Sequence, residues 1–202
     1  LSEIEKNLLF FGIEINKLSK KKMCILQESK YSSWITNLNK FKRFQQTEII
    51  EKILMEKSLT SSSAWIKFFD QTMTRLKFDF RKKKLSETEI INLFSSSDEM
   101  VRKDAAMSFG KTLKDNIFNF TFIMNNISKD LDIDKKLRGF KHSESSRHLS
   151  NQIDKEDVDS LVKTVTSNYE DICHRYYCYK AKHFKKKKLD FWDRNAPYPG
   201  TK

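Results

Sequence analysis

The sequence has little glycine or proline, with only 4 Gly and 2 Pro among 202 residues. Barrels and sandwiches made of β-strands need many tight turns, which draw on these two residues, so the composition argues against both. The chain is 38% hydrophobic and 33% charged, which is too apolar for a disordered tail. We therefore expect a mainly α protein, organised as one large domain or two small ones.

A long hydrophobic run is also missing. The longest, Leu8 to Ile13, is well short of the roughly 20 residues that a transmembrane helix needs. The first residue is Leu, and no basic segment leads into an apolar stretch with a cleavage site, so we expect neither a membrane partner nor a secretory signal. The cysteines Cys24, Cys173 and Cys178 are odd in number and irregularly spaced, which is typical of reduced thiols and favours a cytoplasmic location.

Positive charge is in excess, since 39 Lys and Arg face 27 Asp and Glu, a formal net charge of +12. The run Lys185–Lys188 could follow a phosphate backbone with help from stacking aromatic rings. The aromatic residues beside it are Phe184, Phe191 and Trp192. Acidic residues follow at Asp190 and Asp193, and lysines are spread along the whole chain. We interpret the run as a solvated helix end followed by a strand, and we do not expect nucleic acid as a partner.

Helical periodicity is the main structural signal. Apolar residues from Val158 to Tyr176 fall on one helical face, with Asp154 placed as a cap, which predicts a helix over 155–184. A second stripe from Val101 to Leu131 predicts one continuous helix of about eight turns, which Ser96 and Glu99 begin as a capping box.

A second capping box, Ser86 with Glu89, predicts a shorter helix over 86–95, and Leu85 and Ile90 flank it as a hydrophobic staple. Further helices are expected near 1–19, 31–44 and 47–76. Alternating apolar and polar residues from Leu76 to Phe80, followed by a basic turn, predict a short strand or hairpin near 76–84. The expected fold is thus a helical scaffold divided by one hairpin.

No catalytic constellation is visible in this sequence. A helical zinc site of the H-E-x-x-H kind needs two histidines four residues apart, and none of the four histidines has that spacing: His142, His148, His174 and His183. No glycine-rich phosphate loop is present.

Two clusters of side chains have a plain structural interpretation. Cys173, His174 and Cys178 lie close together in sequence, but we expect Cys173 in the core and His174 about 100° away around the helix. The aromatic residues Trp65, Phe68 and Phe69 are also expected to be core.

Four stretches together resemble the oligoendopeptidase F family, the bacterial branch of the thimet-oligopeptidase-like zinc peptidases. They are EKSLTSSSAWIKFFD at Glu56–Asp70, LRGF at Leu137–Phe140, SSRHLSN at Ser145–Asn151 and LDFWDRNAPYP at Leu189–Pro199. Their order and separations match that family over essentially the whole chain.

The resemblance implies a helical, bowl-shaped peptidase whose channel admits short peptides. It implies that residues 1–12 are the tail of a truncated N-terminal helical region, 13–80 an oligopeptidase F N-terminal-like helical domain, and 85–202 the start of the zinc peptidase domain. In that family, zinc bound by H-E-x-x-H and a later Glu activates water. This sequence contains no such motif, so we assign it no catalytic, cofactor-binding or metal residue. We expect a fragment that is inactive alone and binds no zinc.

Two questions stay open at this point. The chain could assemble with a separately encoded C-terminal half, or it could be a stand-alone basic helical module that binds nucleic acid or an acidic protein. Arg147, His148 and Asn151 could orient substrate or pin a loop, and we favour the loop. Because both long apolar stripes need partners, we also expect poor solubility of the isolated chain.

Overall fold

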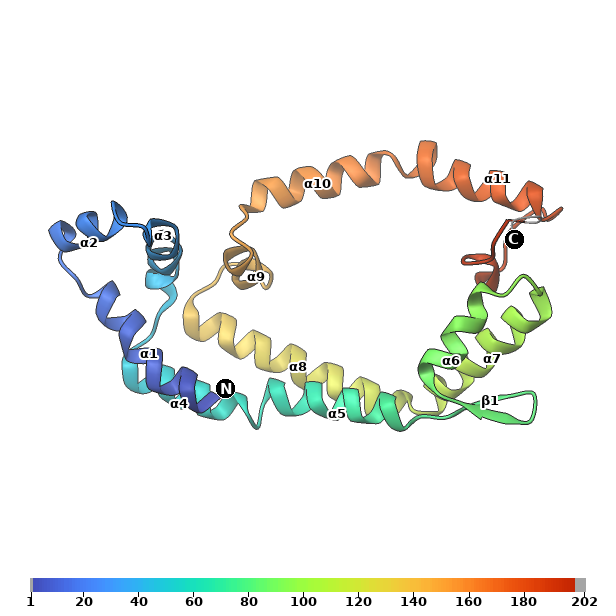
Figure 1. Cartoon of the computed structure of the whole chain (residues 1–202), viewed down its shortest axis with the longest axis horizontal. Coiled ribbons are helices and arrows are strands. Elements are labelled where there is room, and N and C mark those ends of the chain that lie inside the picture. The colour runs from blue at the N-terminus through green and yellow to red at the C-terminus, as the bar shows by residue number, and fades with distance from the viewer. Residues whose placement is uncertain (1, 199–202) are drawn as a thin grey trace. The chain divides into compact units, whose positions relative to one another are not determined.

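The computed structural model describes residues 2–198 of the chain, and the side chains of residues 8–198. The regular secondary structure of these residues consists of helices and one two-stranded antiparallel hairpin (Figure 1). The expectation of a mainly α fold with a hairpin near 76–84 is confirmed. Contacts divide the chain into two compact units, each made of two separate segments: unit 1 comprises residues up to 66 and 124–159, and unit 2 comprises 67–123 and residues from 160 onward.

The helices and strands follow the chain in this order. Unit 1 contains α1 (Ser2–Asn16), α2 (Lys20–Gln27), α3 (Ser32–Phe41), the 3-10 turn η1 (Lys42–Phe44), α4 (Glu48–Ser58) and α9 (Ser145–Ser150). Three helices continue from one unit into the other, namely α5 (Ser62–Arg75), α8 (Ile117–Arg138) and α10 (Lys155–Ser167). Unit 2 contains β1 (Phe78–Phe80), β2 (Lys83–Leu85), α6 (Glu87–Asn92), the 3-10 turn η2 (Leu93–Ser95), α7 (Glu99–Asp115), the π-helical turn η3 (Tyr169–His174), α11 (Arg175–His183) and the 3-10 turn η4 (Phe191–Asp193).

Most predicted helices lie where the sequence placed them, with two differences in the N-terminal third. The helix α2 was not predicted, and the helix expected over 47–76 is divided into α4 and α5 by a turn at 59–61. The strand expected after the lysine run is also wrong. The 3-10 turn η4 forms there instead, because Asp193 accepts a hydrogen bond from the backbone N–H of Asp190 and so closes the chain on itself.

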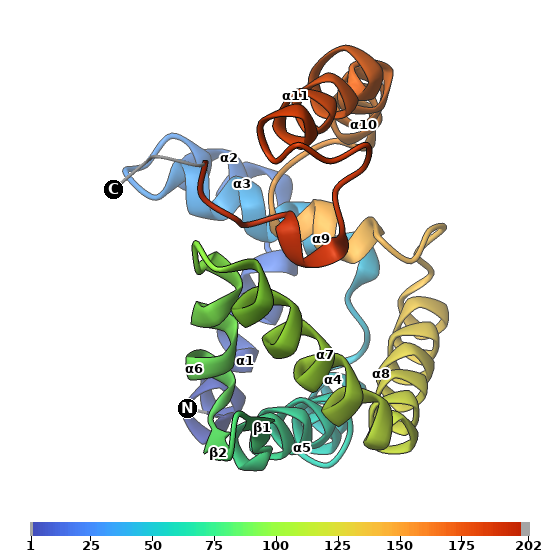
Figure 2. The same ribbon diagram turned by 90° about the vertical axis from the view of Figure 1, so that its right-hand side faces the viewer.

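The core of unit 2 lies where the hairpin packs against α6 and α7 (Figure 2). Phe78, Ile90 and Ala105 are fully buried there, and the ring of Phe109 stacks on Phe78 with 5.2 Å between centroids. The two residues of the hairpin turn, Arg81 and Lys82, have φ of 43° and 69°. A two-residue hairpin turn requires such left-handed conformations, and here they are adopted without glycine.

The capping box at Ser86 is confirmed. The Ser86 hydroxyl accepts from the backbone N–H of Glu89, and the Glu89 carboxylate accepts from the backbone N–H of Ser86 at 2.7 Å. Leu85 and Ile90 meet in the same apolar cluster, as the staple predicts.

The capping box predicted at Ser96 and Glu99 is wrong. Asp98 caps α7 instead, and its carboxylate accepts from the backbone N–H of Met100 at 2.8 Å. The Ser96 hydroxyl accepts from the N–H of Asp98 and so holds the cap in place. A carboxylate at the cap also interacts favourably with the helix dipole, which a serine does not.

The single helix predicted over 101–131 is also wrong, because the chain breaks at Asn116. This residue has φ −106° and ψ 11°, and its side-chain amide donates to the carbonyl of Thr112 at 2.9 Å. Asparagine competes with the helical hydrogen bonds in this way, while the apolar period continues on both sides of the break. The result is two helices, α7 and α8.

The core of unit 1 is small. Ile15, Met23 and Ile35 form its buried part, with Leu18, Leu26 and Leu38 packed around them.

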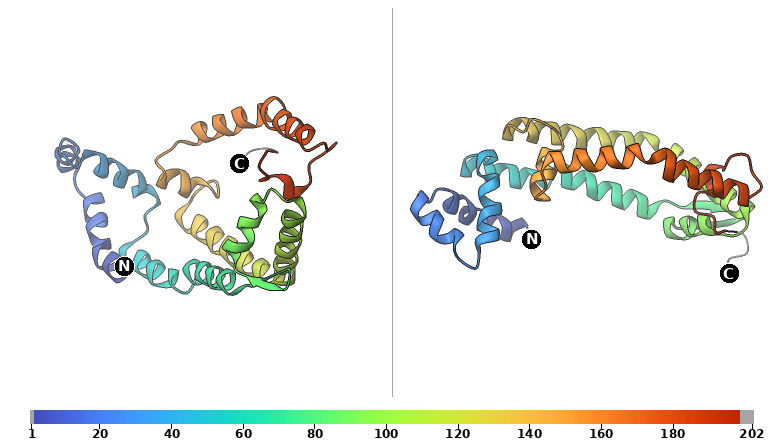
Figure 3. Two further views of the ribbon diagram at one scale, coloured as in Figure 1. Left: turned by 45° about the vertical axis from the view of Figure 1, so that its right-hand side comes forward. Right: turned by 90° about the horizontal axis from the view of Figure 1, so that it is seen from above.

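The segment over 155–184 forms α10, the π-helical turn η3 and α11 in close succession (Figure 3). The predicted helix is therefore confirmed in extent, with a π-helical turn inside it. Residues 159–179 are exposed throughout. Most of the predicted apolar face is consequently left uncovered by the described residues. No helix in the described part of the chain combines the length and the apolar character needed to span a bilayer.

Adjacent isoleucines on α6 allow a direct test of the unit 2 core. Ile90 is 0% exposed and Ile91 is 40% exposed. We expect Ile90→Ala to lower the free energy of unfolding by about 2 to 5 kcal/mol, because it leaves a cavity. Ile91→Ala should change it by less than about 1 kcal/mol. Urea denaturation followed by circular dichroism measures both, and equal effects would contradict this core.

Candidate functional site

A buried arginine organises one end of unit 2. The side chain of Arg102, on α7, is 1% exposed and donates four hydrogen bonds. It reaches the carboxylate of Asp193 at 2.8 Å and the backbone carbonyls of Ser96, Ser97 and Trp192 at 2.8, 3.0 and 3.2 Å. The guanidinium thus joins the loop before α7 to the η4 turn.

Lys186 completes this network from the other side. Its ammonium donates to Glu99 at 2.6 Å, to Asp190 at 3.1 Å and to Asp193 at 2.6 Å. Lys185 before it has φ 54°, a left-handed conformation that ends α11 and reverses the chain toward α7. The middle of the lysine run is therefore part of an internal ion cluster.

The charges in this cluster shift one another's protonation. Burial raises the pKa of Asp193, but hydrogen bonds from Lys186 and Arg102 outweigh it, so the pKa lies below its ordinary value. Burial lowers the pKa of Lys186, but hydrogen bonds to Asp193, Glu99 and Asp190 raise it by more. The pKa therefore lies well above its ordinary value. Both groups are charged at neutral pH.

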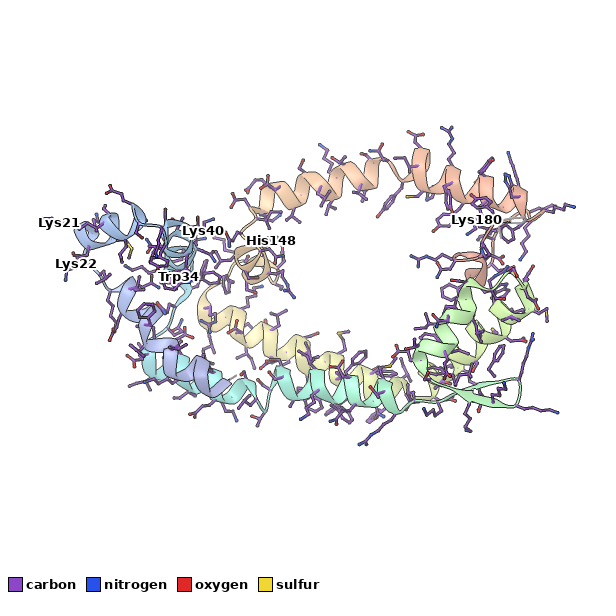
Figure 4. The ribbon with its side chains drawn as sticks, viewed as in Figure 1. Lys21, Lys22, Trp34, Lys40, His148 and Lys180 are labelled. Atoms are coloured by element: carbon purple, nitrogen blue, oxygen red, sulfur yellow. The ribbon has the colours of Figure 1, made fainter. Side chains whose placement is uncertain are left out.

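A second lysine fixes the segment after η4. Lys180 on α11 is buried and donates to the carbonyl of Arg194 at 2.8 Å (Figure 4). Its ammonium lies 5.9 Å from the ring centroids of both Phe184 and Tyr198. Together with Arg102 and Lys186, it anchors residues 189–198 to α7 and α11.

The acidic side chains of this cluster do not suit zinc. Glu99, Asp190 and Asp193 are the single group of three possible ligands found among residues 8–198, with ligand atoms within 4.8 Å of one another. The ammonium of Lys186 already contacts all three carboxylates. The set contains no His or Cys, and carboxylate oxygens alone are the ligands of hard cations. The residues present therefore do not fit a zinc ion.

An arginine also organises unit 1, at the stretch LRGF. Arg138, at the end of α8, donates to both carboxylate oxygens of Glu51 at 2.8 and 3.0 Å and to Asp134 at 2.8 Å. It also donates to the carbonyl of Phe44 at 3.4 Å. This bidentate pair ties α8 to α4, and bidentate geometry is the strongest form of the arginine–carboxylate interaction.

Neighbouring groups complete that contact. The backbone N–H of Gln46 donates to Glu51 at 2.8 Å, and its side-chain amide donates to the carbonyl of Leu137 at 2.6 Å. Burial raises the pKa of Glu51, but hydrogen bonds from Arg138 and Gln46 hold it below its ordinary value. Phe140 is buried and stacks on Phe44, with 4.1 Å between ring centroids.

The stretch SSRHLSN forms α9, and it is held by its backbone. The N–H of Asn151 donates to the carbonyl of Arg147 at 2.9 Å, and the N–H of Ile153 donates to the carbonyl of His148 at 3.1 Å. Among the side chains that the structure describes, those of Arg147, His148 and Asn151 take part in no hydrogen bond or ion pair. Whether they orient a substrate or pin the loop stays a prediction.

Two expectations about core residues are wrong. Cys173 is exposed, like Cys24 and Cys178, because the helical face that carries it has no partner among the described residues. Phe68 and Phe69 are 44% and 42% exposed, whereas Trp65 is half-buried.

Comparison with known proteins shows what this chain is similar to. Residues 14–78 match the family model described as oligopeptidase F. The resemblance to oligoendopeptidase F is confirmed. The structure of oligoendopeptidase F from Enterococcus faecium has a TM-score of 0.83 and 18% identity to this chain, and the match covers 98% of this chain and 40% of the other.

Two further solved structures are similar to this chain. A candidate peptidase from Chlamydophila abortus has a TM-score of 0.78 and 16% identity, with 96% of this chain and 34% of the other covered. A candidate oligoendopeptidase F from Bacillus anthracis has a TM-score of 0.63 and 16% identity, with 98% and 37% covered. This chain thus spans about two fifths or less of their length. No curated protein matches the sequence significantly.

Three of the four stretches that carried the resemblance to oligoendopeptidase F occupy defined positions in this fold. LRGF and LDFWDRNAPYP supply or surround the arginine-centred clusters, and SSRHLSN forms α9. Their partners Glu51 and Arg102 lie outside these stretches, and sequence reasoning missed both. A buried acid or arginine within a helix carries no local signal of its partner.

Substituting Gly139 and Gly110 by alanine should change the stability of the chain in opposite directions. Gly139, after α8, has φ 71°, whereas Gly110 lies within α7, and a Cβ at either position meets nothing within 4 Å. We expect Gly139→Ala to destabilise by about 1 to 2 kcal/mol because of its left-handed backbone. Gly110→Ala should stabilise by about 0.5 to 1 kcal/mol because alanine favours a helix. Chemical denaturation measures both, and stabilisation by Gly139→Ala would contradict the described end of α8.

The buried ion pair between Arg102 and Asp193 in unit 2 predicts a loss of stability that depends on pH. We expect Asp193→Asn to lower the free energy of unfolding by about 3 kcal/mol at pH 7, because Arg102 and Lys186 lose a charged partner. Because the pKa of Asp193 is lowered on folding, this difference should be complete above about pH 4 and should shrink as the pH falls further.

The exposed pair Arg81–Asp104 provides the control for that experiment. Its atoms are 3.2 Å apart, and both side chains are largely exposed. Asp104→Asn should therefore cost less than about 1 kcal/mol. Denaturant titrations of both variants between pH 3 and 7 make the comparison, and equal losses would show that the buried pair adds nothing.

Proposed function

We propose that this chain forms part of the wall of an oligoendopeptidase F-like zinc peptidase, which in complete form hydrolyses short peptides. The observation that carries the proposal is the likeness to the Enterococcus faecium oligoendopeptidase F, which covers 98% of this chain and 40% of that one. The match of residues 14–78 to the oligopeptidase F model supports it further. Within the proposal, residues 1–12, 13–80 and 85–202 correspond to the N-terminal tail, the oligopeptidase F N-terminal-like domain and the first part of the peptidase domain.

The proposal assigns the zinc ion to polypeptide that is not part of this sequence. No H-E-x-x-H motif is present, and the acidic cluster at Lys186 does not fit zinc. We therefore expect this chain to bind no stoichiometric zinc and to cleave no peptide alone. We also propose that the chain is cytoplasmic, because an odd number of cysteines is typical of reduced thiols.

The exposed apolar face of α10 and α11 supports assembly with a separate chain. Leu161 and Val165 on α10 are 61% and 47% exposed, and Ile172 in the π-helical turn is 62% exposed. Apolar residues at helical spacing normally pack against another surface. We propose that a separately encoded C-terminal half, carrying the zinc motif, covers this face.

The alternative of a nucleic-acid-binding module receives no support from the lysine run. Lys186, in its middle, is bound by three carboxylates. The run therefore does not offer four free ammonium groups to a phosphate backbone, and we do not adopt this alternative.

The test begins with the coding sequence that follows Lys202. It is read for H-E-x-x-H and a later Glu, and the polypeptide that carries the motif is produced together with this chain. Hydrolysis of a quenched fluorescent peptide is then measured for each chain and for the pair. We expect activity from the pair, its loss with a zinc chelator, and none from this chain alone. Hydrolysis by this chain with its own bound metal would overturn the proposal.

Substitutions on α10 test the assembly surface. We expect Leu161→Glu with Val165→Glu to prevent co-purification of the two chains, because charges on that face cannot be buried without partners. The same double variant should leave the unfolding free energy of the isolated chain within about 1 kcal/mol, since both side chains are exposed.

Lys163→Glu is the matched control on the same helix. Lys163 lies about 140° around the helix from Val158, the first residue of the apolar face. It should leave co-purification intact. If all variants co-purify equally well, another surface makes the contact.

A further inference from the structure

An open cavity of unit 1 gathers more positive than negative charge. The cavity measures about 510 Å³ and lies between the end of α3 and the end of α9. Its basic lining residues are Lys40, Lys42, Arg43 and His148, and its remaining lining residues are Asn39, Leu149, Gln152, Ile153 and Asp154. All of them belong to unit 1.

Three basic side chains of this cavity have no partner, whereas some lysines on other helices do. Lys52, Lys111 and Lys155 each pair with an acid four residues away along their helices. Among residues 8–198, Lys40 and Lys42 pair with no acid and donate no hydrogen bond, and the same is true of the His148 side chain. Figure 4 labels Lys40 on α3 and His148 on α9, which lie on neighbouring elements of the same unit.

Arg43 lies at the edge of this cavity, against an aromatic ring. Its guanidinium carbon lies 4.5 Å from the ring centroid of Phe44. That ring is itself stacked on buried Phe140. A guanidinium fixed on an aromatic face keeps its donors free for a planar or tetrahedral anion, at little cost in conformational entropy.

The charge balance favours a doubly charged ligand. Lys40, Lys42 and Arg43 contribute three positive charges, and Asp154 is the acid among the lining residues. These four side chains together carry a charge of about +2, which matches a phosphate dianion. A volume of several hundred Å³ exceeds that of a phosphate alone, and Leu149 and Ile153 supply apolar surface for an organic group.

We propose that this cavity, lined by Lys40, Lys42, Arg43 and His148, binds the phosphate group of a small organic phosphate. Arg43 makes the bidentate contact, the two lysines neutralise charge, and His148 closes the site from α9. The proposal does not rest on the peptidase function, since every lining residue lies within unit 1.

Binding of pyrophosphate to the purified 202-residue chain tests this proposal. Equilibrium dialysis at constant ionic strength gives the affinity, and citrate serves as a carboxylate anion of similar charge. Lys40→Gln with Lys42→Gln should weaken pyrophosphate binding at least tenfold. Arg43→Lys keeps the charge but removes the fork, and it should weaken binding about threefold or more.

The matched control is Lys21→Gln with Lys22→Gln, which removes the same charge from α2 in the same unit (Figure 4). It should change the affinity less than twofold. The four histidines report the position of the ligand, because the ring resonance of His148 should shift in the NMR spectrum while those of His142, His174 and His183 should not.

Several results would overturn the proposal. Equal losses in both double variants would indicate attraction to overall charge, and equal affinity for citrate would exclude selectivity for phosphate. The absence of a His148 shift at saturating pyrophosphate would place the ligand elsewhere. Circular dichroism of each variant separates a lost site from a lost fold, and a folded Arg43→Lys variant decides the matter if the double variant unfolds.

Discussion

The buried guanidinium of Arg102 is the interaction on which the order of unit 2 depends. One side chain satisfies a carboxylate and three backbone carbonyls from two segments that are far apart in sequence. Burying a charge is unfavourable unless it is paired and fully hydrogen-bonded, and Arg102 meets both conditions. Without it, the carbonyls of Ser96, Ser97 and Trp192 would lose their donor. The 3-10 turn η4 would then depend on Lys186, which binds both Asp193 and Glu99 of α7.

Unit 1 uses the same chemistry at Arg138. There too the guanidinium binds a carboxylate in two places and a backbone carbonyl, and it ties the end of one helix to another helix. Both units have small apolar cores, so these polar contacts carry a larger share of the specificity of the fold than in a protein with a large core. Two of the four stretches that carry the resemblance to oligoendopeptidase F, LRGF and LDFWDRNAPYP, contribute Arg138 and Asp193 to these clusters.

How much of the fold and of the candidate site could be predicted from the sequence depends on how far apart in the chain the interacting residues lie. The capping box at Ser86 is local, so its residues and spacing were enough to place α6. The break at Asn116 was missed because the apolar period continues across it, and only the side-chain hydrogen bond to Thr112 reveals it. The pairing of Arg102 with Asp193 spans 91 residues, and no spacing rule reaches that far. The exposure of Cys173 was missed because periodicity identifies a face that needs a partner but does not identify the partner.

The interleaving of the two units has a consequence for the order in which the chain folds during synthesis. Unit 1 needs residues 124–159, so it cannot be completed before the whole first segment of unit 2, residues 67–123, has been synthesised. The two clusters that close the units, Glu51 with Arg138 and Arg102 with Asp193, join residues 87 and 91 positions apart. Closing loops of that length is entropically costly and is slow compared with the formation of single helices. The nascent chain therefore carries formed helices with uncovered apolar faces for most of its translation, a period in which a chaperone would protect it from aggregation.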